Sequence, residues 1–164
     1  MNEYTIPPVR FDSPPMDARM LSQQMDWGLR EHNMPKLWKR SAGQGVLVIV
    51  LDTGVPRHSD LPKSVFTANM TNDASELDRN GHQTHCAGIV AAQNDQQGVV
   101  GWAPEADLAH IKVLSDQGSG RSTWISAGID FAIMQWKLRK SDYTACIISM
   151  SPVSYTHLTL PTKA

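Results

Sequence analysis

The feature that most constrains the fold is an unbroken apolar run at residues 46–51, which ends in Asp52. The run is rich in β-branched residues and has no polar face, which is typical of a parallel strand covered on both sides. Residues 108–114 and 146–150 are two further strand candidates. Three such segments favour a sheet buried between two layers of helices.

Helical patterns separate these strands. Residues 84–92 are small and apolar, which predicts a buried helix. Ser122 can cap a longer helix that places four large or apolar side chains on one face: Ile125, Ile129, Ala132 and Trp136. A short helix is predicted at 35–43, and turn-rich residues 56–80 predict surface loops. The alternation of strands and helices predicts an α/β fold with a mostly parallel sheet and right-handed crossovers.

Length and net charge limit the kinds of partner that the chain is expected to bind. The 164 residues suit one domain, and a formal charge of −1 predicts neither a nucleic-acid partner nor a membrane surface. The apolar run at 46–51 is far shorter than the ~20 residues that span a bilayer. No secretion signal is evident near Met1, so a cytoplasmic location is preferred, with secretion requiring an upstream signal. Cys86 and Cys146 are expected to be buried free thiols.

The tripeptide Asp52-Thr53-Gly54 is the first candidate for chemistry. A carboxylate at the C-terminal end of a parallel strand lies where open α/β sheets place their ligands. The same aspartate could instead cap a turn. Aspartic proteases carry this tripeptide twice in an all-β fold, and haloacid-type phosphatases need a second aspartate where Gly54 stands. Neither of these two active classes fits the chain.

The second candidate is His82, in the segment Asn80-Gly-His-Gln-Thr-His-Cys-Ala-Gly88. A histidine at the mouth of a buried helix can act as a general base when a carboxylate holds its other ring nitrogen. It could also be a solvated loop side chain. Metal binding together with His85 lacks a nearby third ligand.

Together these segments resemble the subtilisin-like serine proteases of peptidase family S8, whose catalytic residues follow the order Asp, His, Ser. The resemblance covers residues 21–151, including 91–94, 98–106, 111–114, 118–120, 124–133 and 147–151. It implies a three-layer α/β/α fold, truncated on its C-terminal side. Residues 1–20 are expected to form an extended or propeptide-like arm. Residues 152–164 do not resemble the family and are interpreted as a sequence or cloning scar.

The resemblance also implies roles. Asp52 would orient and charge-stabilise the imidazole of His82, which would be the general base acting on a polypeptide substrate. Two extended edges, Gly118-Ser119-Gly120 and Ser151, would pair with that substrate. A structural Ca²⁺ ion is implied as the cofactor. Its ligands would be the side chains of Gln23, Asp60 and Asp95 and the carbonyls of Gln93, Gln97 and Val99.

Two departures from the family bear on activity. Gln83 stands where the family has glycine, and its side chain is expected to crowd the substrate pocket. The nucleophilic serine and the oxyanion-hole asparagine are expected downstream of Ser151 and are not in this sequence. The expected function is therefore a serine endopeptidase, present as an inactive fragment. A catalytically dead peptide-binding module is the alternative, and a nucleotide-binding α/β protein finds no phosphate-binding loop to support it.

Overall fold

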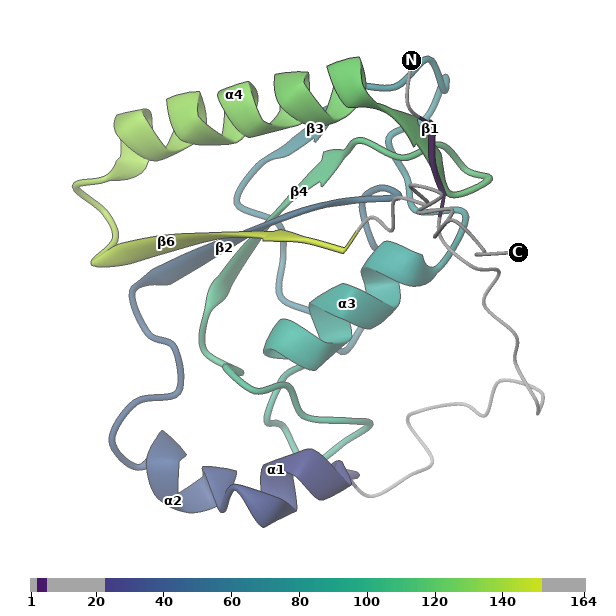
Figure 1. Cartoon of the computed structure of the whole chain (residues 1–164). Coiled ribbons are helices and arrows are strands. Elements are labelled where there is room, and N and C mark those ends of the chain that lie inside the picture. The colour runs from purple at the N-terminus through teal and green to yellow at the C-terminus, as the bar shows by residue number, and fades with distance from the viewer. Residues whose placement is uncertain (1–2, 6–22, 152–164) are drawn as a thin grey trace, which may run out of the picture.

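A computed structural model describes residues 3–5 and 23–151 (Figure 1). Its main sheet has the strand order β3-β4-β2-β6, and every neighbouring pair is parallel. The strands are β2 (Val46–Asp52), β3 (Thr67–Asn69), β4 (Asp107–Lys112) and β6 (Ala145–Met150). The predicted parallel sheet is confirmed.

The strand β3 corrects the prediction that residues 56–80 form loops alone. Three residues are too few to show a strand pattern, and their pairing comes from the edge of β4. The backbone beside them joins the same edge, because the N–H of Val65 donates to the carbonyl of Leu108. Tertiary pairing, rather than local sequence, therefore makes this strand.

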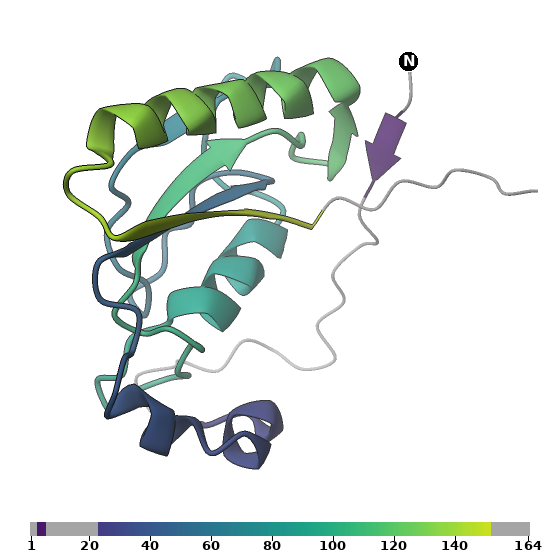
Figure 2. The same cartoon turned by 60° about the vertical axis from the view of Figure 1, so that its left-hand side comes forward.

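Helices cover both faces of the sheet. The helix α3 (His82–Ala91) packs on one face and α4 (Ser122–Arg139) on the other (Figures 1 and 2). Alternate residues of β2 point to opposite faces: Leu47, Ile49 and Leu51 join the core beneath α4, whereas Val48 and Val50 join the core beneath α3. This arrangement is the expected three-layer α/β/α fold, and it explains why residues 46–51 have no polar face.

Both long helices differ in detail from prediction. In α3 only one row is fully buried, formed by Gln83, Ala87 and Ala91, so the expectation of a wholly buried helix is wrong. The sheet covers one side of this helix, and Ile89 on another side is 49% exposed. In α4 the N-cap is Arg121 and no side chain makes a capping bond, so Ser122 is the first helical residue rather than the cap.

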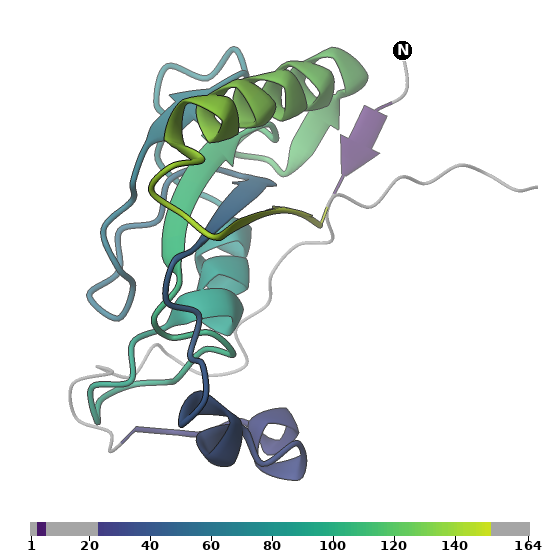
Figure 3. The same cartoon turned by 90° about the vertical axis from the view of Figure 1, so that its left-hand side faces the viewer.

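Two smaller regions complete the described part of the chain. The helices α1 (Trp27–Glu31) and α2 (Met34–Trp38) lie together beyond one end of the sheet (Figure 3), and α2 replaces the helix predicted at 35–43. The strand β1 (Glu3–Thr5) pairs antiparallel with β5 (Ser119–Arg121). The remainder of the predicted arm and all of 152–164 lie outside the described residues. Among the described helices, none has the length and apolar character needed to cross a bilayer.

Candidate active site

Asp52 is the last residue of β2 and is completely buried. Its Oδ1 atom accepts a hydrogen bond of 2.7 Å from the backbone N–H of Thr53. Because β2 is flanked by β4 and β6, the carboxylate is fixed at the carboxyl end of the middle of the sheet. This is the position at which parallel α/β sheets assemble their sites.

His82 is the first residue of α3, and the structure brings it to Asp52. Its Nδ1 atom lies 2.8 Å from Oδ1 of Asp52. The side chain of His82 keeps 19% of its surface exposed, whereas that of Asp52 keeps none. The buried carboxylate therefore holds one ring nitrogen, and the imidazole retains access to solvent.

The charge state of Asp52 depends on two opposing effects. Burial raises the pKa of this carboxyl above its ordinary value, while hydrogen bonds from His82 and Thr53 act to lower it. Its second oxygen, Oδ2, is buried without a hydrogen-bond partner among the described residues. The contact with His82 is therefore the main interaction that favours the ionised carboxylate.

A second carboxylate, that of the half-buried Asp78, fixes the start of α3 and was missed by the sequence analysis. It accepts hydrogen bonds from the backbone N–H groups of Gly81 and Thr84, at 2.9 and 2.8 Å, and from the hydroxyl of Thr53, at 2.8 Å. Burial alone would raise the pKa of Asp78, but these bonds and that from the Thr84 hydroxyl lower it below its ordinary value. An acidic residue shortly before a helix is the signal that could have identified it.

Lys112 is a second residue that sequence reasoning missed. It ends β4 beside Asp52 in the parallel register, and its side chain is fully buried. Its ammonium group donates to the carbonyl of Thr53 and to Asp116 at 2.9 Å, and it lies 3.4 Å from Asp73. A lysine within the predicted strand 108–114 was a visible signal, because a buried charge requires partners.

The structure corrects the prediction for Gln83. Its side chain is fully buried between α3 and the sheet, with its oxygen 3.0 Å from the backbone nitrogen of Gly54. The substituent thus points into the interior rather than into a substrate pocket. The side chain points inward because of the rotation of α3 about its axis, which places Gln83 on the inner face together with Ala87, four residues on.

Both cysteines are free and half-buried. Cys86 lies one turn after His82, with its sulfur 3.8 Å from Nδ1. Burial, and then the charge of Asp52, raises the pKa of Cys86 to about 11, against a hydrogen bond from Ser151. The thiol is therefore protonated near neutral pH.

One cluster of potential metal ligands is found among the described residues, and it consists of Asp52, His82 and Cys86. His85 is not part of it.

The residues expected to line the substrate lie on two segments. Gly118 occupies a turn with φ of 77°, while Ser119 and Gly120 begin β5. The antiparallel register of β1 places Tyr4 opposite Gly120. Ser151 directly follows β6 and is exposed, and its hydrogen bond to Cys86 brings it beside α3. One of these two edges thus carries an added strand.

The six residues expected to bind calcium gather around the loop at 93–99. The side-chain nitrogen of Gln23 donates to the carbonyl oxygens of Gln93 and Val99, at 2.7 and 3.4 Å. Asp60 accepts from the backbone of Val99, and Asp95 from that of Gln97. These bonds tie Gln23 and Asp60 to the loop, and an amide nitrogen of Gln23 faces the carbonyls where a cation would require its oxygen.

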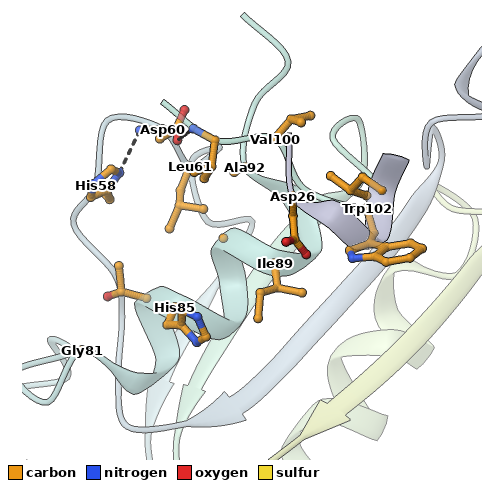
Figure 4. A pocket seen from close by; sticks show the side chains of 14 residues that line it. Asp26, His58, Asp60, Leu61, Gly81, His85, Ile89, Ala92, Val100 and Trp102 are labelled. Atoms are coloured by element: carbon orange, nitrogen blue, oxygen red, sulfur yellow. Dashed lines mark hydrogen bonds between the residues drawn. The ribbon is translucent and has the colours of Figure 1, made fainter. Parts of the chain in front are cut away.

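A cavity of about 680 Å³ lies on the outer side of α3 (Figure 4). His85 and Ile89 of α3 face it, and Trp102 and Asp60 close other sides. Neither Asp52 nor His82 lines this cavity. It is therefore separate from the carboxylate–imidazole pair.

A buried carboxylate that holds a solvent-accessible imidazole at the carboxyl end of a parallel sheet is the arrangement by which Ser–His–Asp hydrolases orient their general base. The subtilase family model matches residues 43–159, and this chain belongs to that family. The match overlaps the first part of 152–164, which lies outside the described residues.

Named relatives agree with this assignment. The chain is 45% identical over 115 residues to an intracellular serine protease of Paenibacillus polymyxa, covering 66% of this chain and 35% of that protein. It is 40% identical over 112 residues to subtilisin Savinase of Lederbergia lenta, covering 68% and 42%. It is 36% identical over 141 residues to thermitase of Thermoactinomyces vulgaris, covering 84% and 47%. The chain thus spans about a third to a half of the length of these relatives.

Proposed function

We propose that this chain supplies the Asp–His part of a serine endopeptidase site. The observation that carries the proposal is the 2.8 Å contact between Nδ1 of His82 and Oδ1 of Asp52. Because Asp52 holds Nδ1, the nitrogen left for proton transfer is Nε2. His82 would take the proton of a serine hydroxyl at Nε2 and return it to the leaving amine, while Asp52 stabilises the imidazolium.

The proposed substrate is a polypeptide bound in extended form along β5. The pairing of β1 with β5 supports this, because an extended segment already adds to that edge as an antiparallel strand. Any side chain on Gly120 would meet Leu114, since a Cβ there lies 2.5 Å from the leucine side chain. The absence of a side chain thus keeps the backbone of β5 close to the sheet.

The 164-residue polypeptide itself is proposed to hydrolyse no peptide. Among residues 3–5 and 23–151, no serine hydroxyl forms a hydrogen bond with His82. In subtilisin, loss of the nucleophile lowers turnover by about 10⁶-fold. A peptide-binding module without catalysis is the second candidate, and the pairing of β1 with β5 favours it.

A chimera tests these proposals. Residues 43–151 would replace the matching segment of thermitase, and kcat would be measured on a peptide substrate. We expect activity, with His82→Ala lowering kcat by about 10⁶-fold and Asp52→Ala by about 3 × 10⁴-fold, the losses found for the same groups in subtilisin. His85→Ala is the matched control and should change kcat little. A folded but inactive chimera would favour the binding module, and an active His82→Ala chimera would refute the proposed base.

Fluorophosphonate labelling tests the 164-residue polypeptide directly. Such probes report an activated serine, so we expect no labelling. Covalent labelling that disappears in His82→Ala would show that the polypeptide carries a working nucleophile, contrary to the proposal.

We further propose that the loop at 93–99 binds a structural Ca²⁺ ion. Its ligands would be Gln23, Asp60 and Asp95 through side chains and Gln93, Gln97 and Val99 through carbonyls, with the amide of Gln23 turned to present its oxygen. Calcium at 100 times its Kd should add about 2.7 kcal/mol to the free energy of unfolding. Urea titrations should show this gain lost in Asp60→Asn and kept in Asp142→Asn. A gain unaffected by Asp60→Asn would place calcium elsewhere.

A further inference from the structure

Gln83 makes hydrogen bonds on both sides of Asp52. Its side-chain oxygen accepts from the backbone N–H of Gly54 at 3.0 Å, two residues after the aspartate. Its side-chain nitrogen donates to the carbonyl of Val50 at 3.2 Å, two residues before it. One side chain of α3 thus holds the backbone that enters and leaves Asp52.

The backbone of Gln83 extends this connection. Its N–H donates to the hydroxyl of Thr53 at 3.1 Å, and that hydroxyl donates to Asp78 at 2.8 Å. Gln83 directly follows His82 in the chain. It therefore joins the helix that carries the imidazole to the strand end that carries the carboxylate, through three separate bonds.

The backbone groups of Gly54 and Val50 determine how the amide of Gln83 is turned, and a further partner of its nitrogen is His110 of β4. Its Nδ1 atom lies 2.7 Å from the amide nitrogen of Gln83 and is itself buried. Burial lowers the pKa of His110 to about 4, so near neutral pH the ring is uncharged and Nδ1 can accept. The two amide hydrogens are then used by Val50 and His110, and the oxygen by Gly54. A reversed amide would set its oxygen against the carbonyl of Val50.

We propose that Gln83 is a positioning residue for the Asp52–His82 pair, with His110 as the partner of its second amide hydrogen. The inference rests on the proposed function, because it concerns the geometry of the same pair. The glycine that stands here in the proteins this sequence resembles could make none of the side-chain bonds. This chain thus holds its pair through a buried amide of its own.

The test follows the Nδ1–H proton of His82 in the 164-residue chain by ¹⁵N-histidine NMR. A proton held between Nδ1 and a carboxylate resonates far downfield and exchanges slowly with water. Gln83→Met keeps the volume of the side chain and removes its amide. In this variant we expect exchange of the His82 Nδ1–H proton with water to accelerate by roughly tenfold or more, because the two side-chain hydrogen bonds that flank Asp52 and the third to His110 are lost. Gln44→Met is the matched control, since Gln44 accepts from the N–H of Ala42 before the opposite end of β2.

A variant of His110 gives a further comparison. If His110 acts through Gln83, then His110→Phe should also accelerate exchange of the His82 proton. The double variant, with His110→Phe and Gln83→Met together, should match Gln83→Met alone. Should Gln83→Met lose its dispersed amide resonances, Gln83→Gly takes its place with the same expectation.

The outcomes separate the two claims. Exchange that is equally slow in the wild type and in the folded Gln83 variants would overturn the positioning role and leave the proposed function standing. Absence of a downfield His82 proton in the wild type would overturn the proposed pair itself, and the positioning role with it. Equal acceleration in Gln44→Met would show a general loosening of β2, which also contradicts the inference.

Discussion

The two sides of α3 differ in what holds them. The inner row of Gln83, Ala87 and Ala91 is fully buried against the sheet, and its one polar side chain is hydrogen-bonded throughout. The outer side presents His85 and Ile89 to a cavity (Figure 4). A sequence of small residues fits both environments equally well. The difference teaches that contact with β2 and β4, rather than composition, decides which side of this helix is rigidly specified.

The inner side also carries the chemistry. His82 begins the helix at the end where Gln83 meets the sheet, so any movement of the inner row would change the distance between His82 and Asp52. Among the described residues, no hydrogen bond joins His85 or Ile89 of the outer side to either member of the pair. Changes on the two sides should consequently have effects of very different size.

The largest effect is expected from the buried ring of His110. Its pKa is lowered to about 4 in the folded chain by burial, against about 6.5 when unfolded. Between pH 6.5 and 4 the unfolded chain therefore binds more protons, and the free energy of unfolding falls as the pH is lowered. The contribution is fully present above pH 6.5 and amounts to about 3 kcal/mol.

Urea titrations at pH 7.5 and 5 would measure about half of this loss. His110→Asn, which has no ring to protonate, should show a shallower dependence on pH than the wild type. His85→Asn on the outer side should keep the wild-type dependence. Parallel pH profiles for His110→Asn and the wild type would show that the buried ring does not titrate in this way.

The contrast also shows how far sequence reasoning reaches. Asp52 and His82 could be placed together, because parallel strands and the helices after them deliver residues to one edge of a sheet. The inward direction of Gln83 could not be predicted, since it depends on the rotation of α3 against β2. Lys112 stood out within the predicted strand 108–114, but its partners come from loops whose course no local pattern specifies. The pattern of apolar residues was enough to predict the three layers of the fold. The hydrogen bonds around Gln83 and Lys112 depend on how the layers pack and could not be predicted from that pattern.

A smaller effect is expected from filling the inner row. Ala87 is fully buried and packs in the cluster that contains Val50 and Leu108. Ala87→Leu adds volume where no space is left, which should lower the free energy of unfolding by about 1–3 kcal/mol. His85→Leu introduces the same side chain on the outer side and should change the free energy of unfolding by about 0.5 kcal/mol or less. Urea denaturation of both variants measures the two changes. Equal losses of stability would mean that the two sides are packed alike.

The smallest effect should have the opposite sign. Gly88 lies inside α3 on the side of the cavity, and a Cβ built on it would meet no atom within 4 Å. Because glycine is a poor helix former, Gly88→Ala should raise the free energy of unfolding by about 0.5–1 kcal/mol. Gly101, beside the end of the same helix, is the control: a Cβ there lies 2.6 Å from the backbone nitrogen of Ala91, so Gly101→Ala should destabilise the chain. A loss of stability in Gly88→Ala, measured by urea denaturation, would show that the outer side is covered in solution and would remove the distinction between the two sides.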